Sequence, residues 1–91
     1  MVAVFSALAS PVRAAIVHRL ADGERTVQGL VDELGLPQPL VSQHLGRLRT
    51  AGLVTGTRTG RSIAYSLSDE HVTHVFLDAL EHAEEHPQRD A

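Results

Sequence analysis

The 91-residue chain contains no cysteine and no lysine, and each absence limits its chemistry. Without cysteine there is no disulfide bond, no thiolate metal ligand and no thiol-based redox sensing. All eight basic side chains are arginine, which binds phosphate or guanine in a bidentate way, although a GC-rich coding bias explains the same preference equally well. No apolar run is long enough to span a membrane and no basic leader is visible, so we expect a cytoplasmic protein without a membrane partner.

Acidic residues are also missing from one part of the chain. Residues 38–65 hold four arginines and no acid, whereas residues 66–91 hold seven acids and one arginine, Arg89. The net charge of −3 therefore hides a basic middle and an acidic end. The basic segment suits phosphates, and the acidic end suits a cation. A chain of this length forms one small domain, whose limited core is commonly supplemented by dimerisation.

Local sequence signals predict several helices in the first half of the chain. We expect a short helix over residues 2–9 and then helices over residues 11–22, 26–34 and 39–51. Each start or stop coincides with a capping or breaking residue, namely Ser10-Pro11, Asp22-Gly23, Thr26, Gly35, Pro39 and Ala51-Gly52.

Residues 26–51 have the order helix, short turn, helix, which is the pattern of a helix-turn-helix. In this motif the second helix enters the major groove of DNA. Its outward face is predicted to contact base edges and phosphates through Gln38, Ser42, Gln43 and Arg47. The alternative is an ordinary solvated helix face, but such a face usually carries Glu or Asp, and this one carries neither.

Residues 53–67 change to a period of two, which predicts a β-hairpin. Ile63, Tyr65 and Leu67 alternate with smaller residues, and Val54 begins the partner strand. We expect a turn over residues 57–61. The two arginines at its tip, Arg58 and Arg61, are predicted to contact the DNA backbone or the minor groove. A solvated hairpin tip is the alternative for either arginine singly.

Residues 69–86 combine an apolar helical stripe with four possible metal ligands, Asp69, His71, His82 and Glu85. His71 and His82 are about 16 Å apart along one helix, too far to share one ion at ligand distances of about 2 Å. Two copies packed antiparallel bring Asp69 and His71 of one chain to His82 and Glu85 of the other. This self-complementary set suits tetrahedral zinc. From spacing alone, a solvated helix flank is an equally good interpretation.

Four segments resemble the ArsR/SmtB family of bacterial metal-sensing repressors: residues 7–13 (ALASPVR), 38–45 (QPLVSQHL), 48–54 (LRTAGLV) and 60–67 (GRSIAYSL). The resemblance implies an α+β, mostly α, winged helix-turn-helix with helices 1–4, a β-hairpin wing and a long C-terminal helix, all in a single domain over residues 1–91. It implies a homodimer through the first and last helices. It also implies a repressor that binds operator double-stranded DNA when metal-free and leaves when Zn(II) binds Asp69, His71, His82 and Glu85.

Three features depart from this pattern or add to it. The helix over residues 26–34 has no cysteine, which excludes thiolate sensing of soft metals. Pro39 stands where related repressors often have a DNA-contacting serine. His74 and His86 are additional histidines, and His86 is a possible extra metal ligand. Co(II) or Ni(II), which prefer more ligands than zinc, are therefore alternative effectors. For His44 we expect packing or a backbone contact rather than metal binding.

Parts of the sequence also fit functions other than a metal-sensing repressor. His82-Ala-Glu-Glu-His86 fits the H-x-x-E-H pattern of zinc proteases, but so short a pattern is weak evidence in a segment rich in His and Glu. We therefore expect no enzyme. A winged-helix regulator that senses no metal, or a protein-interaction module that uses the acidic last helix, keeps the same fold.

Overall fold

The computed structural model describes residues 10–68, 70, 71, 74, 75 and 78. The described elements follow the order α2 (Pro11–Ala21), β1 (Arg25–Thr26), α3 (Val27–Leu34), α4 (Gln38–Thr50), β2 (Val54–Thr59) and β3 (Ser62–Leu67). Residues 70, 71, 74, 75 and 78 are helical. The helix predicted over residues 2–9 and most of the helix predicted over residues 69–86 lie outside the described residues.

Side-chain caps fix where the helices begin. The Ser10 hydroxyl accepts a hydrogen bond from the Arg13 amide at 3.3 Å, and Thr26 caps α3 through the Gly29 amide at 3.0 Å. Gly35 ends α3 in the left-handed region, at φ 66°. The predicted start of α4 at Pro39 is one residue late, because the helix begins at Gln38 with Pro37 as its N-cap.

The strands form one antiparallel sheet in the order β1-β3-β2. Thr59 pairs with Ser62, so β2 and β3 are joined by a two-residue turn at Gly60-Arg61. Gly60 has φ 63°, which glycine adopts without strain in such turns. The prediction of a turn over residues 57–61 with both arginines at its tip is therefore wrong: Arg58 lies within β2, opposite Ile63, and only Arg61 lies in the turn.

The short strand β1 was not predicted. Arg25 pairs with Tyr65 and Thr26 with Ala64, so β3 is the central strand. The alternation predicts Ala64 on the face of the strand that points away from the Tyr65 side chain. Ala64 is nevertheless only 7% exposed, because its strand lies between β1 on one side and β2 on the other. Tyr65 lies across from Gly56, whose missing side chain leaves room for the ring.

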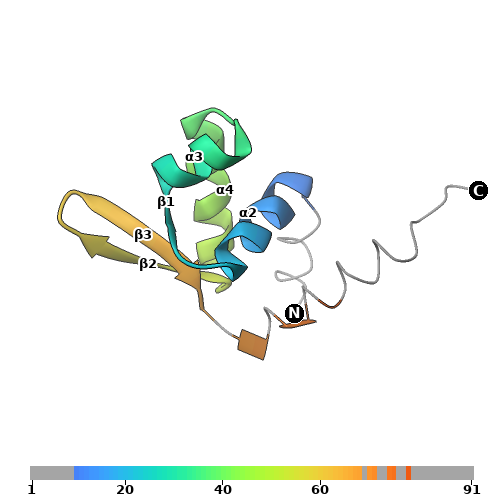
Figure 1. Cartoon of the computed structure of the whole chain (residues 1–91). Coiled ribbons are helices and arrows are strands. Elements are labelled where there is room, and N and C mark those ends of the chain that lie inside the picture. The colour runs from blue at the N-terminus through green and yellow to red at the C-terminus, as the bar shows by residue number, and fades with distance from the viewer. Residues whose placement is uncertain (1–9, 69, 72–73, 76–77, 79–91) are drawn as a thin grey trace, which may run out of the picture.

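Helices α2, α3 and α4 pack around a common core, and the β2–β3 hairpin projects away from them (Figure 1). The largest fully buried side chains are Ile16, Leu30, Val41, Leu45 and Leu48. Burying such a side chain contributes about 1.5–3 kcal/mol. The core therefore fixes the inner face of α4 against α2 and α3.

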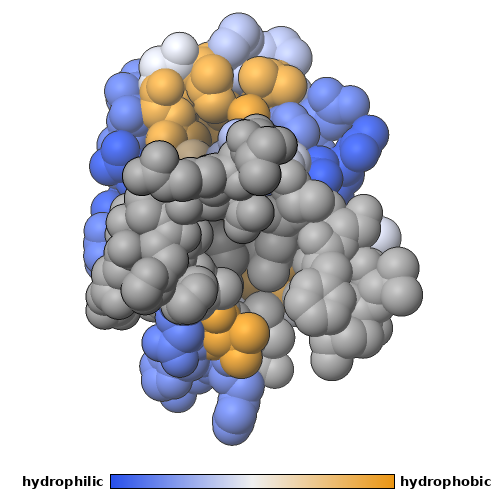
Figure 2. Space-filling view, turned by 90° about the vertical axis from the view of Figure 1, so that its right-hand side faces the viewer, coloured by the Kyte–Doolittle hydropathy of each residue, from blue (hydrophilic) through white to orange (hydrophobic). Residues whose placement is uncertain are grey.

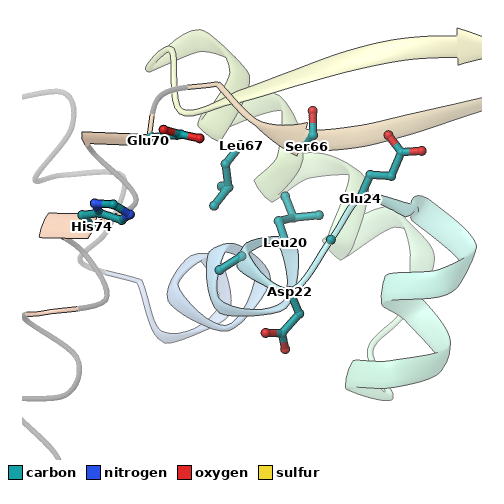
Figure 3. A pocket seen from close by; sticks show the side chains of 9 residues that line it. Leu20, Asp22, Glu24, Ser66, Leu67, Glu70 and His74 are labelled. Atoms are coloured by element: carbon teal, nitrogen blue, oxygen red, sulfur yellow. The ribbon is translucent and has the colours of Figure 1, made fainter.

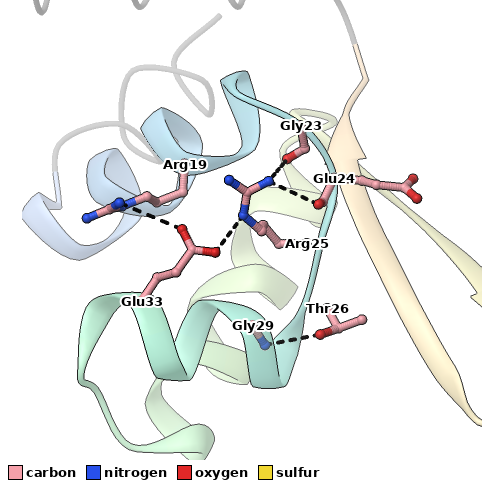
Figure 4. A network of polar contacts seen from close by, with 7 residues as sticks. All are labelled: Arg19, Gly23, Glu24, Arg25, Thr26, Gly29 and Glu33. Carbon is pink, nitrogen blue, oxygen red and sulfur yellow. Dashed lines mark hydrogen bonds and ion pairs between the residues drawn. The ribbon is translucent and has the colours of Figure 1, made fainter.

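A polar network on the surface joins α3 to α2 and to the segment that precedes α3 (Figure 4). Arg25 donates to Glu33 at 2.6 Å and to the carbonyl oxygens of Gly23 and Glu24 at 2.9 and 3.1 Å. Arg19 lies 3.7 Å from the same Glu33 carboxylate. One carboxylate of α3 thus connects α2 with the segment that leads into the helix-turn-helix.

Candidate nucleic-acid interface and metal-ligand positions

Helix α4 shows one buried face and one polar face. Val41, Leu45 and Leu48 are at most 1% exposed. All four predicted DNA-contacting residues of this helix are exposed, namely Gln38, Ser42, Gln43 and Arg47. The core thus holds α4 by its inner face and leaves hydrogen-bonding side chains outward, which is the arrangement that a recognition helix needs.

The hairpin adds two cationic side chains. Arg58 on β2 and Arg61 in the turn are both exposed. Residues 38–65 contain no acidic residue, so no carboxylate within this segment competes with phosphate for its arginines. The exposed face of α4 and the hairpin each present side chains suited to a polyanion.

His44 lies on the flank of α4, between the buried and the exposed face, and is half-buried. Its Nδ1 lies 3.1 Å from Nη1 of Arg13. Burial, together with the charges of Arg13 and Arg47, lowers the pKa of the His44 imidazole. The expected packing or backbone contact is thus a side-chain hydrogen bond to a residue of α2.

Sequence reasoning did not single out Arg13, which is only 8% exposed. A signal was present: Arg13 has the same helical spacing as Ile16, Val17 and Leu20, all of which are buried. A charged residue at the start of an apolar face predicts a buried group with hydrogen-bond partners.

Most of the predicted metal ligands, Asp69, His82, Glu85 and the additional His86, lie outside the described residues. His71 is helical and exposed, and so is the additional His74. Within the described part of the chain, no group of three or more His, Cys, Asp or Glu side chains could hold a metal ion.

A cavity of about 480 Å³ lies where the end of α2, the end of β3 and the helical residues 70 and 74 meet (Figure 3). Leu20 and Leu67 form part of its wall, and Glu70 and His74 lie on one side of it. The described residues that line this cavity form no group of three or more side chains that could hold a metal ion.

Apolar surface is present as well. Val75 is 64% exposed, the one large hydrophobic residue in the described part with such exposure. Apolar side chains gather on the face of the molecule seen in Figure 2. None of the helices among the described residues is long and apolar enough to cross a membrane.

Three packed helices, an outward polar helix face and an arginine-bearing hairpin define a winged helix-turn-helix DNA-binding protein. The sequence pattern of the family described as bacterial regulatory protein, arsR family, matches residues 10–55. The chain belongs to this family of DNA-binding transcriptional regulators and is not an enzyme, as expected.

Several relatives are named transcriptional repressors or regulators. The chain is 57% identical over 79 residues to the repressor SmtB of Mycobacterium tuberculosis. The aligned segment covers 87% of this chain and 58% of SmtB. It is 44% identical over 84 residues to the regulator KmtR of the same organism, with coverage of 92% and 65%. A SmtB homolog of Synechocystis is 36% identical over 85 residues, with coverage of 93% and 64%. The chain thus spans less than two thirds of these relatives.

Solved structures confirm the predicted fold class. A homodimeric winged helix-turn-helix DNA-binding domain from Mycobacterium bovis, a possible ArsR-family regulator, has TM-score 0.87 and 32% identity, covering 96% of this chain and 81% of that one. HlyU of Vibrio cholerae has TM-score 0.81 and 32% identity, with coverage of 96% and 91%.

Proposed function

We propose that the protein is a cytoplasmic, homodimeric repressor that binds operator double-stranded DNA when metal-free and releases it when Zn(II) binds between the last helices. The observation that carries the DNA half is the exposed, acid-free face of α4, whose opposite face is buried in the core. The similarity to proteins named repressors supports the direction of regulation.

The DNA contacts divide between the two basic elements. Gln38, Ser42, Gln43 and Arg47 of α4 face base edges and phosphates in the major groove. Arg58 and Arg61 of the hairpin face the backbone or the adjacent minor groove.

The metal half rests on the spacing of Asp69, His71, His82 and Glu85 in an acidic segment. Two imidazoles and two carboxylates are a fitting donor set for a closed zinc site, where the ion would neutralise the carboxylates and join the two last helices. In the antiparallel pairing proposed here, each dimer holds two such sets. The first helix contributes to the same interface. Val75 belongs to the apolar stripe of the last helix.

The runner-up is the same repressor with Co(II) or Ni(II) as effector. His74, one helical turn beyond His71 and exposed, and His86, next to Glu85, favour it because these metals accept more ligands than zinc.

Alanine variants of two ligands test the metal half separately from the DNA half. Asp69→Ala and His82→Ala should bind operator as the unmodified protein does, but should no longer release it with zinc. His18→Ala is the matched control, because His18 is exposed on α2 and outside the proposed set. Zinc-dependent release that persists in the ligand variants would refute the assigned site, and loss of release in the control would do so as well.

A further inference from the structure

Arg13 is the one buried charged residue in the described part of the chain. Burying a guanidinium is costly unless its N–H groups find partners. Its main chain is already fixed, because the Arg13 amide donates to Ser10 in the first turn of α2. Its side chain extends from this turn to α4, where Nη1 meets Nδ1 of His44 at 3.1 Å. The contact connects two helices that are 31 residues apart in the sequence.

Only one assignment of donor and acceptor is possible for this contact. An arginine side chain has five N–H donors and no acceptor, so Arg13 donates and His44 accepts. An imidazole nitrogen accepts only when it carries no proton. His44 must therefore be neutral, with its one ring proton on Nε2.

Because of the position of His44, this contact bears on the orientation of the exposed residues of α4. His44 directly follows Gln43 and lies one helical turn before Arg47, two of the exposed residues of α4. The other residues that hold α4 are Val41, Leu45 and Leu48, and apolar packing is non-directional. A hydrogen bond depends on angle as well as distance. Of the described contacts of α4, the Arg13–His44 hydrogen bond is thus well suited to fix how far the helix is rotated about its axis.

We infer that Arg13 is a positioning residue for operator binding: through neutral His44 it sets the rotation of α4, and protonation of His44 releases the helix and weakens operator binding. The inference rests on the proposed DNA-binding function, but not on its metal half.

The groups that act on His44 are Arg13 from α2 and Arg47 from its own helix, and both are cations. A proton on Nδ1 removes the acceptor and places a third positive charge beside them. Acidification therefore distinguishes two roles of His44. If His44 only adds a phosphate contact when it is charged, operator binding should strengthen as the pH falls. If His44 positions α4, operator binding should weaken.

The test uses the full chain without metal and an operator selected from random double-stranded DNA, with binding followed by fluorescence anisotropy. Arg13→Met removes the donor and keeps an unbranched side chain. His44→Asn keeps an acceptor near the position of Nδ1 but does not titrate. The pH profile of the unmodified protein is compared with that of the His44→Asn variant, which cancels the contributions of the other five histidines.

At about pH 7.5 we expect Arg13→Met to weaken operator binding roughly tenfold and His44→Asn to change it by about twofold or less. Between about pH 7.5 and pH 5.5, the unmodified protein should lose affinity relative to His44→Asn. Unchanged binding by Arg13→Met, or a relative gain of affinity on acidification, would overturn the inference.

A nuclear magnetic resonance measurement on the unmodified protein covers the case in which Arg13→Met does not fold. Long-range ¹H–¹⁵N correlations of the His44 ring should show the proton on Nε2 at neutral pH, and a proton on Nδ1 would overturn the inference. If the unmodified protein binds no operator at all, the proposed function fails and this inference with it. If it binds normally but Arg13 has no effect, only this inference fails.

Discussion

At the scale of single residues, two glycines that look alike in the sequence differ in what surrounds them. A Cβ on Gly56 of β2 would meet side-chain carbons of Ile63 and Tyr65, both at 3.0 Å, whereas a Cβ on Gly46 of α4 would meet nothing within 4 Å. The glycine in the sheet is therefore a packing requirement, and the glycine in the helix is not.

Gly56→Ala should lower the free energy of unfolding by about 1–3 kcal/mol, because the Tyr65 ring has to shift. Gly46→Ala is the matched control and should raise it by about 0.5–1 kcal/mol, since alanine favours the helical backbone. Urea denaturation at one fixed protein concentration measures both, because a dimer's stability depends on concentration. Equal effects of the two substitutions would contradict the close contact at Gly56.

His44 makes stability depend on pH. Its pKa is lowered in the folded protein by burial and by Arg13 and Arg47, whereas the unfolded chain takes up the proton at about pH 6.5. The unfolded chain therefore binds more protons below this pH, so the contribution of His44 is fully present above about pH 6.5 and declines as the pH falls. Relative to His44→Asn, the unmodified protein should lose stability on acidification, measured by urea denaturation at a series of pH values. A constant difference between the two proteins would disprove the shift.

The sequence predicted individual residues well where a helical period marked them. Val41, Leu45 and Leu48 recur at helical spacing in the predicted helix over residues 39–51 and are buried. The burial of Arg13 was not predicted, because a charged side chain is rarely buried unless it has a partner. The side chain of Arg13 contacts His44, a residue far along the chain, and single-sequence periodicity contains no information about such a partner.

At the scale of elements, capping residues explain why the helices were predicted nearly to their ends. Caps act within three or four residues, so Ser10, Thr26 and Gly35 are readable from the sequence alone. The sheet depends on pairing between distant residues. Strand β1 has two residues and exists through its pairs with β3, and so no local pattern revealed it.

The hairpin offers a test at this scale, because its arginines are proposed to contact phosphate. Arg61→Ala should weaken operator binding similarly for different DNA sequences and should reduce the slope of log affinity against log salt by about 1. Thr59→Ala is the matched control, an exposed uncharged neighbour in the same hairpin. Fluorescence anisotropy over a salt series gives both slopes. An unchanged slope for Arg61→Ala would mean that Arg61 touches no phosphate.

At the scale of the whole molecule, the proposed repressor consists of two copies of the chain. The spacing of Asp69, His71, His82 and Glu85 predicts an antiparallel pair of last helices, and this prediction remains untested because most of these residues lie outside the described part. Val75, on the apolar stripe of that helix, is 64% exposed in the single chain.

Val75→Glu should raise the dimer dissociation constant at least about tenfold, because an unpaired charge would be buried in the proposed interface. Thr59→Glu, which adds the same charge to an exposed position on the hairpin, should leave dimerisation unchanged. Analytical ultracentrifugation over a range of concentrations measures both. Full dimerisation of Val75→Glu would place the interface elsewhere.

In the proposed repressor, metal binding at the last helices lowers operator affinity. The most direct measurement is operator binding by fluorescence anisotropy while buffered free zinc is raised stepwise and then removed with a chelator. Because the coupling is reciprocal, zinc and operator should each weaken the other's binding by the same factor, about 5- to 150-fold. Affinity that falls with zinc and recovers with chelator is the predicted result. Tight operator binding that is indifferent to zinc, cobalt and nickel would contradict the account.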